Sequence, residues 1–189
     1  DSITFGQYVD PRRRWTSLVA QRLREELGED AFDSHNRGVS GGSRRRGLER
    51  FAADVQALEP DVVTIQFGLN DCNCWETDRG LPRVSEAAYQ ANLVEMVSRA
   101  RRFGAQCVII ATNHRTLRRA PLPSGESYEE ANARYSEIAR SVAAGTGALL
   151  CDVREAFDHY DDGELEELLL PYPDHLHLSE AGNAVYADL

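Results

Sequence analysis

A serine at one end of the chain and an aspartate and histidine near the other end have side chains suited to nucleophilic catalysis. Ser2 offers a hydroxyl nucleophile, while Asp174 and His177 are three residues apart. At that spacing one tight turn can hold the carboxylate against one imidazole nitrogen and leave the other nitrogen facing a serine. His175 lacks this spacing, so we assign the base to His177 and expect His175 at the rim of the site. A nucleophile, a base and a group that orients the base are the side chains that acyl transfer requires.

Acyl transfer also needs hydrogen-bond donors aimed at the developing oxyanion, and two loops can supply them. Asn70 follows the apolar run 61–67, and its side-chain amide donates without titration. The alternative role for Asn70 is that of a turn cap. Gly38 belongs to a loop whose glycines permit backbone geometry that other residues resist. Each of these signals is weak alone, and it is their joint occurrence that indicates acyl transfer.

Four further residues near these positions are predicted to contact substrate. Asp71 would either order its loop or line the site, and a solvated turn carboxylate is the alternative. Trp75 would form a wall of the acyl site or pack on a helix. Asn113 and His114 follow a predicted strand, and an ordinary surface histidine is the alternative role for His114.

The elements that must position these residues alternate between strand and helix along the chain. Apolar, β-branched runs between breakers predict strands at 61–67, 107–111 and 148–153, with a shorter strand around 32–36. Helical spacing, capping residues and glycine or proline stops predict helices over 10–28, 48–58, 85–104, 127–144, 154–157, 164–170 and from 179 to the last residue, 189. This alternation predicts an α/β fold: a parallel sheet covered by helices on both faces, in a three-layer α/β/α domain.

Length and composition narrow the class of protein. A chain of 189 residues that is 42% hydrophobic suits one domain with a substantial core. The net charge of −10 argues against nucleic acid or an anionic membrane as the main partner. The arginine runs 12–14 and 44–46 are exceptions that we interpret as solvated helix faces. No apolar run approaches the ~20 residues that span a bilayer, and no signal peptide is visible.

The four cysteines are predicted to be free thiols. Cys107 and Cys151 lie in predicted strands, while Cys72 and Cys74 are too close together for an ordinary bridge and lack a second pair at zinc spacing. Free thiols favour the cytoplasm as the compartment.

Four short blocks of sequence carry a resemblance to a known family. They are Asp1-Ser2-Ile3-Thr4, which lacks the leading glycine of the family pattern, Asn36-Arg37-Gly38, Gly68-Leu69-Asn70-Asp71, and Asp174-His175-Leu176-His177-Leu178-Ser179. In this order, and across the whole chain, they resemble the SGNH subgroup of the GDSL hydrolase superfamily. The resemblance implies a flavodoxin-like sheet and serine ester hydrolysis that needs no cofactor or metal.

The same resemblance implies a role for each matched residue. Ser2 would be the nucleophile, His177 the base and Asp174 its orienting partner. The oxyanion hole would consist of the N–H of Ser2, the N–H of Gly38 and the side-chain amide of Asn70. Small or carbohydrate-borne esters, such as acetyl esters, are the expected substrates. An acyltransferase on the same site and a binding module without catalysis remain alternatives.

The start of the chain differs from what the family pattern requires. A serine presented on a strand-to-helix turn needs the strand, and this chain begins one residue before Ser2. We therefore expect the first strand, and the end of the last helix, to lie outside residues 1–189. A signal peptide lost with that strand would change the expected compartment.

Overall fold

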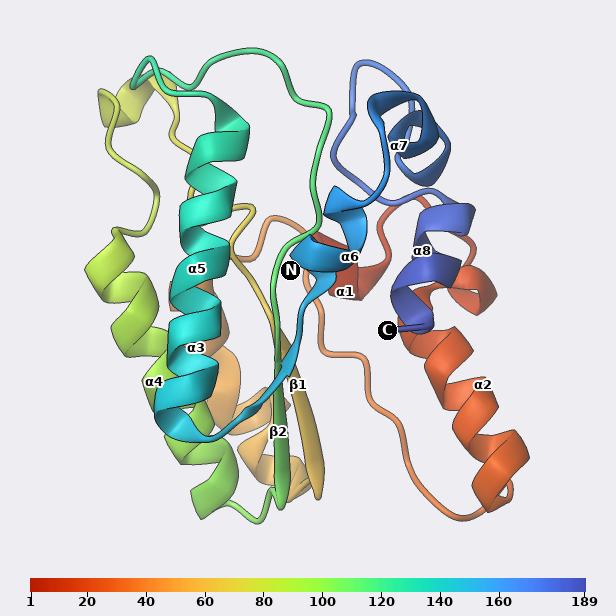
Figure 1. The fold of residues 1–189 in the computed structure, drawn as a ribbon. Coiled ribbons are helices and arrows are strands. Elements are labelled where there is room, and N and C mark those ends of the chain that lie inside the picture. Colours follow the sequence, from red (N-terminus) through yellow and green to blue (C-terminus); the bar gives the residue numbers. More distant parts are fainter. The chain divides into compact units, whose positions relative to one another are not determined.

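The computed structural model describes residues 1–189, apart from the side chain of Arg44. Contacts divide the chain into two compact units (Figure 1). The terminal unit comprises Asp1–Gly41, Thr116–Arg118 and His159–Leu189, and the sheet unit comprises Gly42–Arg115 and Arg119–Asp158. The single domain expected over 1–189 stays a prediction.

Three parallel strands form the sheet of the sheet unit, in the order β1, β2, β3. They are β1 (Val62–Gln66), β2 (Cys107–Ala111) and β3 (Leu149–Cys151). Val62 pairs with Cys107 at one end of the ladder and Gln66 pairs with Ala111 at the other. The three strands expected from the apolar runs are confirmed, with β3 shorter than predicted.

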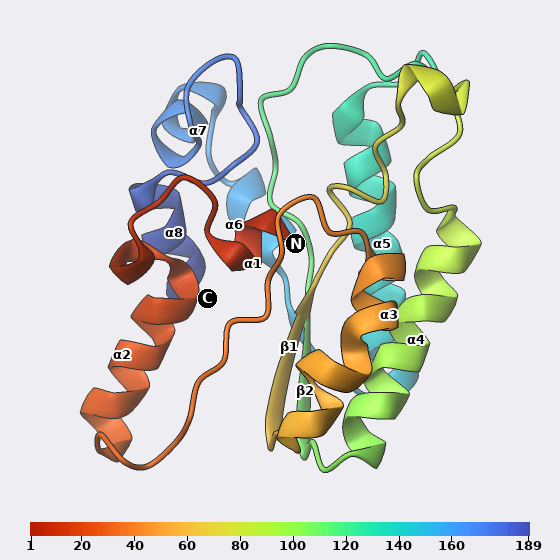
Figure 2. The same ribbon diagram turned by 180° about the vertical axis from the view of Figure 1, so that it is seen from behind.

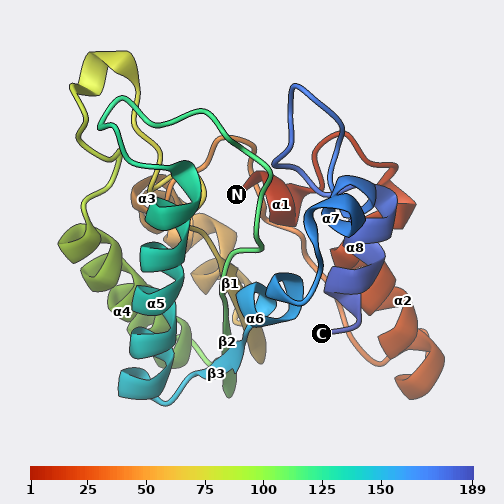
Figure 3. The same ribbon diagram turned by 45° about the horizontal axis from the view of Figure 1, so that its top comes forward.

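Helices pack against one face of this sheet. They are α3 (Arg44–Asp54), α4 (Glu86–Arg102) and α5 (Tyr128–Thr146), which lie side by side next to the strands (Figure 3). The short helix α6 (Val153–Asp158) follows β3, and the 3₁₀ turns η2 (Gln56–Leu58) and η3 (Glu76–Asp78) complete the unit. Alternate residues of the strands, such as Val63 and Ile65, enter a core with Leu93, Met96 and Val97 of α4. The period of two along each strand places these apolar side chains on the helix-covered face.

Capping residues set the ends of the two long helices as predicted. The Ser85 side chain accepts a hydrogen bond from the Ala88 N–H at the start of α4, and Ser127 and Glu130 form a reciprocal capping box at the start of α5. Gly104 has a φ of 109°, a conformation that favours glycine, two residues after α4 ends.

The terminal unit is built from short helices around Trp15. Its elements are α1 (Ser2–Phe5), η1 (Pro11–Arg13), α2 (Trp15–Leu27), α7 (Asp162–Leu168) and α8 (Glu180–Ala187), and α2 lies beside α8 (Figure 2). The Trp15 ring stacks on Tyr186 with 4.9 Å between centroids, and its Nε1–H donates to the Ile3 carbonyl. The Trp15 N–H donates to Asn183 Oδ1 at 3.0 Å. These contacts fix α1, and with it Ser2, to the α2 and α8 pair.

Several elements differ from the sequence prediction, among them the helix predicted over 48–58, which is α3 (Arg44–Asp54) followed by the turn η2. Residues 32–36 form no strand in the described backbone, because most of their side chains are exposed and no strand pairs with them. Asp10 caps the 3₁₀ turn η1 rather than an α-helix, and Arg14 is extended, so α2 begins only at Trp15. Helix α8 ends at Ala187 instead of running to Leu189. None of the described helices combines the length and apolar character needed to cross a bilayer.

Candidate active site

His177 links a serine hydroxyl to a carboxylate in the terminal unit. Its Nε2 lies 3.0 Å from Ser2 Oγ, and its Nδ1 lies 2.8 Å from Asp174 Oδ2. The structure thus brings together the predicted nucleophile, base and orienting carboxylate, although Ser2 and His177 are 175 residues apart. His175 is not part of this chain of hydrogen bonds, and its ring instead meets Tyr172 edge-on.

A tight turn over residues 174–177 holds the carboxylate against the imidazole. Asp174 Oδ1 accepts hydrogen bonds from the backbone N–H of Leu176 at 3.0 Å and of His177 at 2.7 Å. This leaves Oδ2 for the His177 ring. His175 has a φ of 49°, which closes the turn, and its carbonyl accepts a hydrogen bond from the Leu117 N–H. The three-residue spacing seen in the sequence is therefore the spacing that this turn requires.

The charge on Asp174 determines which imidazole nitrogen carries the proton. Burial raises the pKa of Asp174, but the hydrogen bonds from the His177 backbone, the His177 ring and the Leu176 N–H outweigh it, so the pKa lies below its ordinary value of 3.8. An ionised carboxylate can only accept hydrogen bonds, so Nδ1 is assigned the hydrogen. Nε2 then presents its lone pair to the Ser2 hydroxyl, the arrangement that a general base needs.

The nucleophile candidate occupies the first turn of a short helix. Ser2 is the first residue of α1 and is buried, and Asp1 caps the helix by accepting a hydrogen bond from the Ile3 N–H at 2.9 Å. Backbone N–H groups in the first turn of a helix have no intrahelical partner. The Ser2 N–H is thus a suitable donor for an oxyanion that forms at its own hydroxyl.

Tyr8 is a neighbour of His177 that sequence reasoning missed. Its ring meets the His177 ring edge-on, with 5.4 Å between centroids, and 70% of the residue is exposed. The φ of Tyr8 is 68°, an uncommon value for a residue other than glycine. The sequence around Tyr8 carries no signal of this contact, because the contact depends on where the chain brings residue 177.

The backbone N–H of Gly38 bonds to a side chain only two residues away. The Gly38 N–H donates to Asn36 Oδ1 at 2.9 Å, so the group expected at the oxyanion is committed to a neighbouring side chain. A Cβ at Gly38 would lie 2.3 Å from the Phe5 nitrogen, so glycine is needed there for close backbone approach to α1. The donor role of Gly38 stays a prediction, while its packing role is visible.

Asn70 lies in the sheet unit, just past the carboxyl end of β1. Its Oδ1 accepts a hydrogen bond from Arg83 Nη1 at 3.3 Å, and its Nδ2 donates to the Gly42 carbonyl at 3.4 Å. Gly68, two residues earlier, has a φ of 135°, and a Cβ there would lie 2.2 Å from Asn113 Nδ2. Only glycine therefore allows this turn after the strand.

Three of the residues expected to contact substrate are buried. Asp71, Asn113 and His114 are 0%, 1% and 0% exposed, and substrate contact by them stays a prediction. The alternatives of a solvated carboxylate at Asp71 and a surface histidine at 114 are wrong, because both residues are buried. Buried polar side chains gather past the carboxyl ends of β1 and β2, and this packing could not be inferred from either strand alone.

A buried network around Asn113 pairs some of these polar groups. Gln66 Nε2 donates to Asn113 Oδ1 at 2.9 Å, and Asn132 Nδ2 donates to the His114 carbonyl at 3.0 Å. The His114 ring lies 5.5 Å from the ring of Phe157. Such groups specify the packing of the strand ends. Trp75 is the exception among the four, since it is 54% exposed.

The cysteines are free thiols, as predicted. Cys72 and Cys74 are buried, and burial raises the pKa of the Cys72 thiol well above its ordinary range. Buried thiols of this kind are poor nucleophiles. Within the described part of the chain, no group of three or more His, Cys, Asp or Glu side chains is arranged to hold a metal ion.

Comparison with known proteins places the chain in a family. The sequence profile of the GDSL-like Lipase/Acylhydrolase family matches residues 1–185. The chain belongs to this family. Among relatives of this GDSL-like chain, esterase TesA of Pseudomonas aeruginosa is 31% identical over 144 residues, which are 76% of this chain and 62% of TesA. Acetylxylan esterase of Geobacillus stearothermophilus is 27% identical over 162 residues, which are 80% of this chain and 67% of that protein.

A solved structure agrees with the fold. LAE5, an α/β hydrolase from the metagenome of Lake Arreo in Spain, superposes with a TM-score of 0.77 at 26% identity, over 100% of this chain and 88% of that one. The predicted α/β fold with a parallel sheet is confirmed, and it is that of the SGNH hydrolases.

The chain spans only part of the length of its sequence relatives. It spans 62% of the length of TesA, and 44% and 50% of the lengths of two further relatives.

Proposed function

We propose that this GDSL-like chain is a serine ester hydrolase with Ser2 as its nucleophile. The observation that carries the proposal is the pair of hydrogen-bonding contacts at His177, 3.0 Å to Ser2 Oγ and 2.8 Å to Asp174 Oδ2. A hydroxyl, an imidazole and an ionised carboxylate in this order form the arrangement that activates a serine. The family match and the esterases among the relatives support the same reaction class.

The first half of the proposed reaction forms an acyl-enzyme. Ser2 Oγ bonds to the ester carbonyl carbon while His177 Nε2 takes the hydroxyl proton, and the carbonyl electron pair moves to oxygen. The Ser2 N–H and the Asn70 side-chain amide are the donors that we expect for this oxyanion. Collapse of the tetrahedral intermediate breaks the bond to the leaving alcohol, which takes the proton from His177.

The second half returns the enzyme to its starting state. Water attacks the acyl carbon and gives a proton to His177, and collapse releases the carboxylic acid while Ser2 Oγ regains the proton. Asp174 stays ionised throughout and stabilises the imidazolium that forms twice in the cycle.

Acetyl esters, free or on carbohydrates, are the substrates we propose. The likeness to an acetylxylan esterase supports this class. Hydrolysis of p-nitrophenyl acetate, butyrate and octanoate would show the preferred acyl length, and we expect acetate to give the highest kcat/KM. Silence on all three esters, with transfer to an added sugar or alcohol, would indicate an acyltransferase instead.

The serine is tested by a pair of matched variants. Ser2→Ala should lower kcat on the order of 10⁶-fold, because the nucleophile and its base act as one unit. Ser34→Ala, at an exposed serine of the same unit, should leave kcat unchanged. Ester hydrolysis by Ser2→Ala at the rate of the unsubstituted chain would disprove the proposal.

A further inference from the structure

The side-chain amide of Asn70 lies between a group that only donates hydrogen bonds and a group that only accepts them. Arg83 Nη1 donates to Asn70 Oδ1 at 3.3 Å, and Asn70 Nδ2 donates to the Gly42 carbonyl at 3.4 Å. A guanidinium has no acceptor, and a carbonyl has no donor. Turning the amide over would place nitrogen against nitrogen and oxygen against oxygen. Both contacts are therefore satisfied in one orientation of the amide.

The orientation matters because the two ends of an amide have opposite effects on an oxyanion. The NH₂ end has two hydrogens, so one can remain on the Gly42 carbonyl while the other is available to an oxyanion. The oxygen end would repel the same negative charge. Donors fixed in advance toward developing charge are what makes such a site effective.

Arg83 is itself held beside Asn70 by the backbone of its loop. The Arg83 N–H donates to the Asn73 carbonyl at 2.8 Å, and the Val84 N–H donates to the Asp71 carbonyl at 3.2 Å. These two bonds close the loop onto residues 71 and 73, just after Asn70. The position of Arg83 is thus a property of the fold and does not depend on its side chain alone.

Trp75 fixes the guanidinium from a second direction. Arg83 Cζ lies 4.3 Å from the centroid of the Trp75 ring, within the range of a cation–π contact. The Trp75 N–H donates to Asp78 Oδ2 at 2.9 Å, which holds the tryptophan at the start of η3. A guanidinium that stacks on a ring and donates from its edge has little freedom to turn.

We infer that Arg83 is a positioning residue that keeps the N–H end of the Asn70 side-chain amide available to the oxyanion. This inference rests on the proposed function, because it gives Asn70 the donor role in that reaction. Arg83 acts through Asn70: it fixes the amide's orientation, and its positive charge polarises the amide so that the N–H donates more strongly. Trp75 contributes to this positioning because its ring holds the Arg83 guanidinium in place.

The test is a double-mutant cycle on p-nitrophenyl acetate. Arg83→Met keeps an unbranched side chain that can lie on Trp75 but removes the donor. It should lower kcat on the order of tenfold with KM unchanged, because the amide remains but is no longer oriented. Asn70→Ala should lower kcat on the order of 10²–10³-fold. In the Asn70→Ala background, Arg83→Met should cause no further loss, because no amide is left to orient.

Two further variants control for charge and for folding. Arg79→Met removes an exposed arginine from the same loop and should leave kcat unchanged. Arg83→Lys keeps the donor and the charge, and it should recover part of the kcat that Arg83→Met loses. All variants should melt at the temperature of the unsubstituted chain, so that a loss of kcat is not a loss of folded protein.

Three results would overturn the inference. One is an equal loss of kcat on Arg83→Met in the presence and absence of Asn70, which would mean that Arg83 acts on substrate directly. Another is a change in KM alone. The third is full activity of Arg83→Met when Asn70→Ala is impaired. Retained activity in Ser2→Ala or in Asn70→Ala would instead count against the proposed function, so the two failures are distinguishable.

Discussion

Asp174 accepts hydrogen bonds from two neighbouring residues, and this dense bonding gives the residue a role in acid stability. Burial raises the pKa of its carboxyl, but bonds from the His177 backbone and ring and from the Leu176 N–H bring the pKa below the ordinary value of 3.8. The ionised form therefore stabilises the folded chain at pH above 3.8, and this stabilisation is lost as the pH falls through the folded-state pKa. The free energy of unfolding should rise with pH across this acid range.

Asp174→Asn should flatten that rise, because the amide does not titrate. Urea midpoints measured at intervals between about pH 2 and pH 6 would compare the slopes of the two chains. Asp33→Asn, at an exposed carboxylate of the same unit, is the matched control and should leave the slope nearly unchanged. Equal slopes for Asp174→Asn and the unsubstituted chain would contradict the assignment of a stabilising, ionised Asp174.

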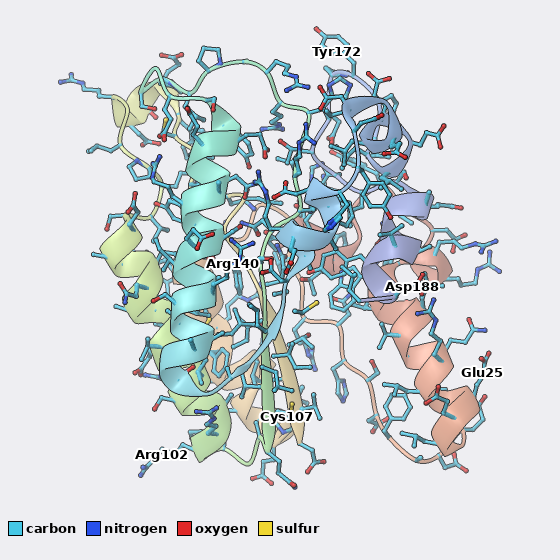
Figure 4. The ribbon with its side chains drawn as sticks, viewed as in Figure 1. Glu25, Arg102, Cys107, Arg140, Tyr172 and Asp188 are labelled. Atoms are coloured by element: carbon cyan, nitrogen blue, oxygen red, sulfur yellow. The ribbon has the colours of Figure 1, made fainter. Side chains whose placement is uncertain are left out.

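One carboxylate, Asp152, lies between β3 and α6 and bonds to the helix α5. Arg140 extends from α5 toward the connection between β3 and α6 (Figure 4) and donates to both oxygens of Asp152, at 2.7 and 2.9 Å. The Thr112 hydroxyl and the Glu155 N–H also donate to Asp152 Oδ1. Burial raises the pKa of Asp152, but these bonds outweigh it and hold the pKa below its ordinary value. A bidentate pair with two further bonds is a strong link between elements.

Asp152→Ala should lower the free energy of unfolding by about 2 kcal/mol, because it removes the bidentate partner of a largely buried guanidinium, which keeps only the more exposed Glu137, and removes the cap of α6. The side chains of Arg140 and Asp152 are only 27% and 18% exposed, so solvent screens the pair weakly. Asp158→Ala removes a carboxylate that is 46% exposed from its pair with Arg154, which keeps its pair with Glu129, and should cost only about 0.5 kcal/mol. Urea titration of both variants measures the difference, and equal losses would contradict the argument.

Local signals predicted the elements well where they were complete within a few residues. The caps at Ser85, Ser127 and Ser179 and the strands that became β1 and β2 follow from chemistry that neighbouring residues share. The segment 32–36 was predicted as a strand and is not one, because a strand also needs a partner, which its own sequence does not specify. The spacing of Asp174 and His177 did predict their contact, because both residues lie in the same turn.

At the scale of the whole molecule, the burial of residues near the strand ends could not be predicted from the sequence. Asp71, Asn113 and His114 follow strands in the expected places, yet their side chains are buried rather than at the surface. The contact between Tyr8 and His177, and the one between Arg83 and Asn70, join residues whose spacing follows no local period. Such contacts depend on packing, and only the folded chain reveals them.

The net charge of −10 gives a prediction about substrates. An acidic protein repels anionic substrates over distances that salt can screen. The kcat/KM for an ester that carries a carboxylate should therefore rise between about 0.02 and 0.5 M NaCl, whereas that for neutral p-nitrophenyl acetate should change little. A fall in kcat/KM for the anionic ester would contradict this account and would indicate a locally positive field, for which the arginine runs 12–14 and 44–46 are candidates.

The central claim, that Ser2 is the activated nucleophile, is tested most directly by covalent labelling. An alkylphosphonate p-nitrophenyl ester should form a bond from its phosphorus to Ser2 Oγ and release p-nitrophenolate. Peptide mass spectrometry should then find one label per chain, on the peptide that contains Ser2, and none on Ser2→Ala or at Ser34. A label on another residue, or equal labelling of Ser2→Ala, would contradict the assignment.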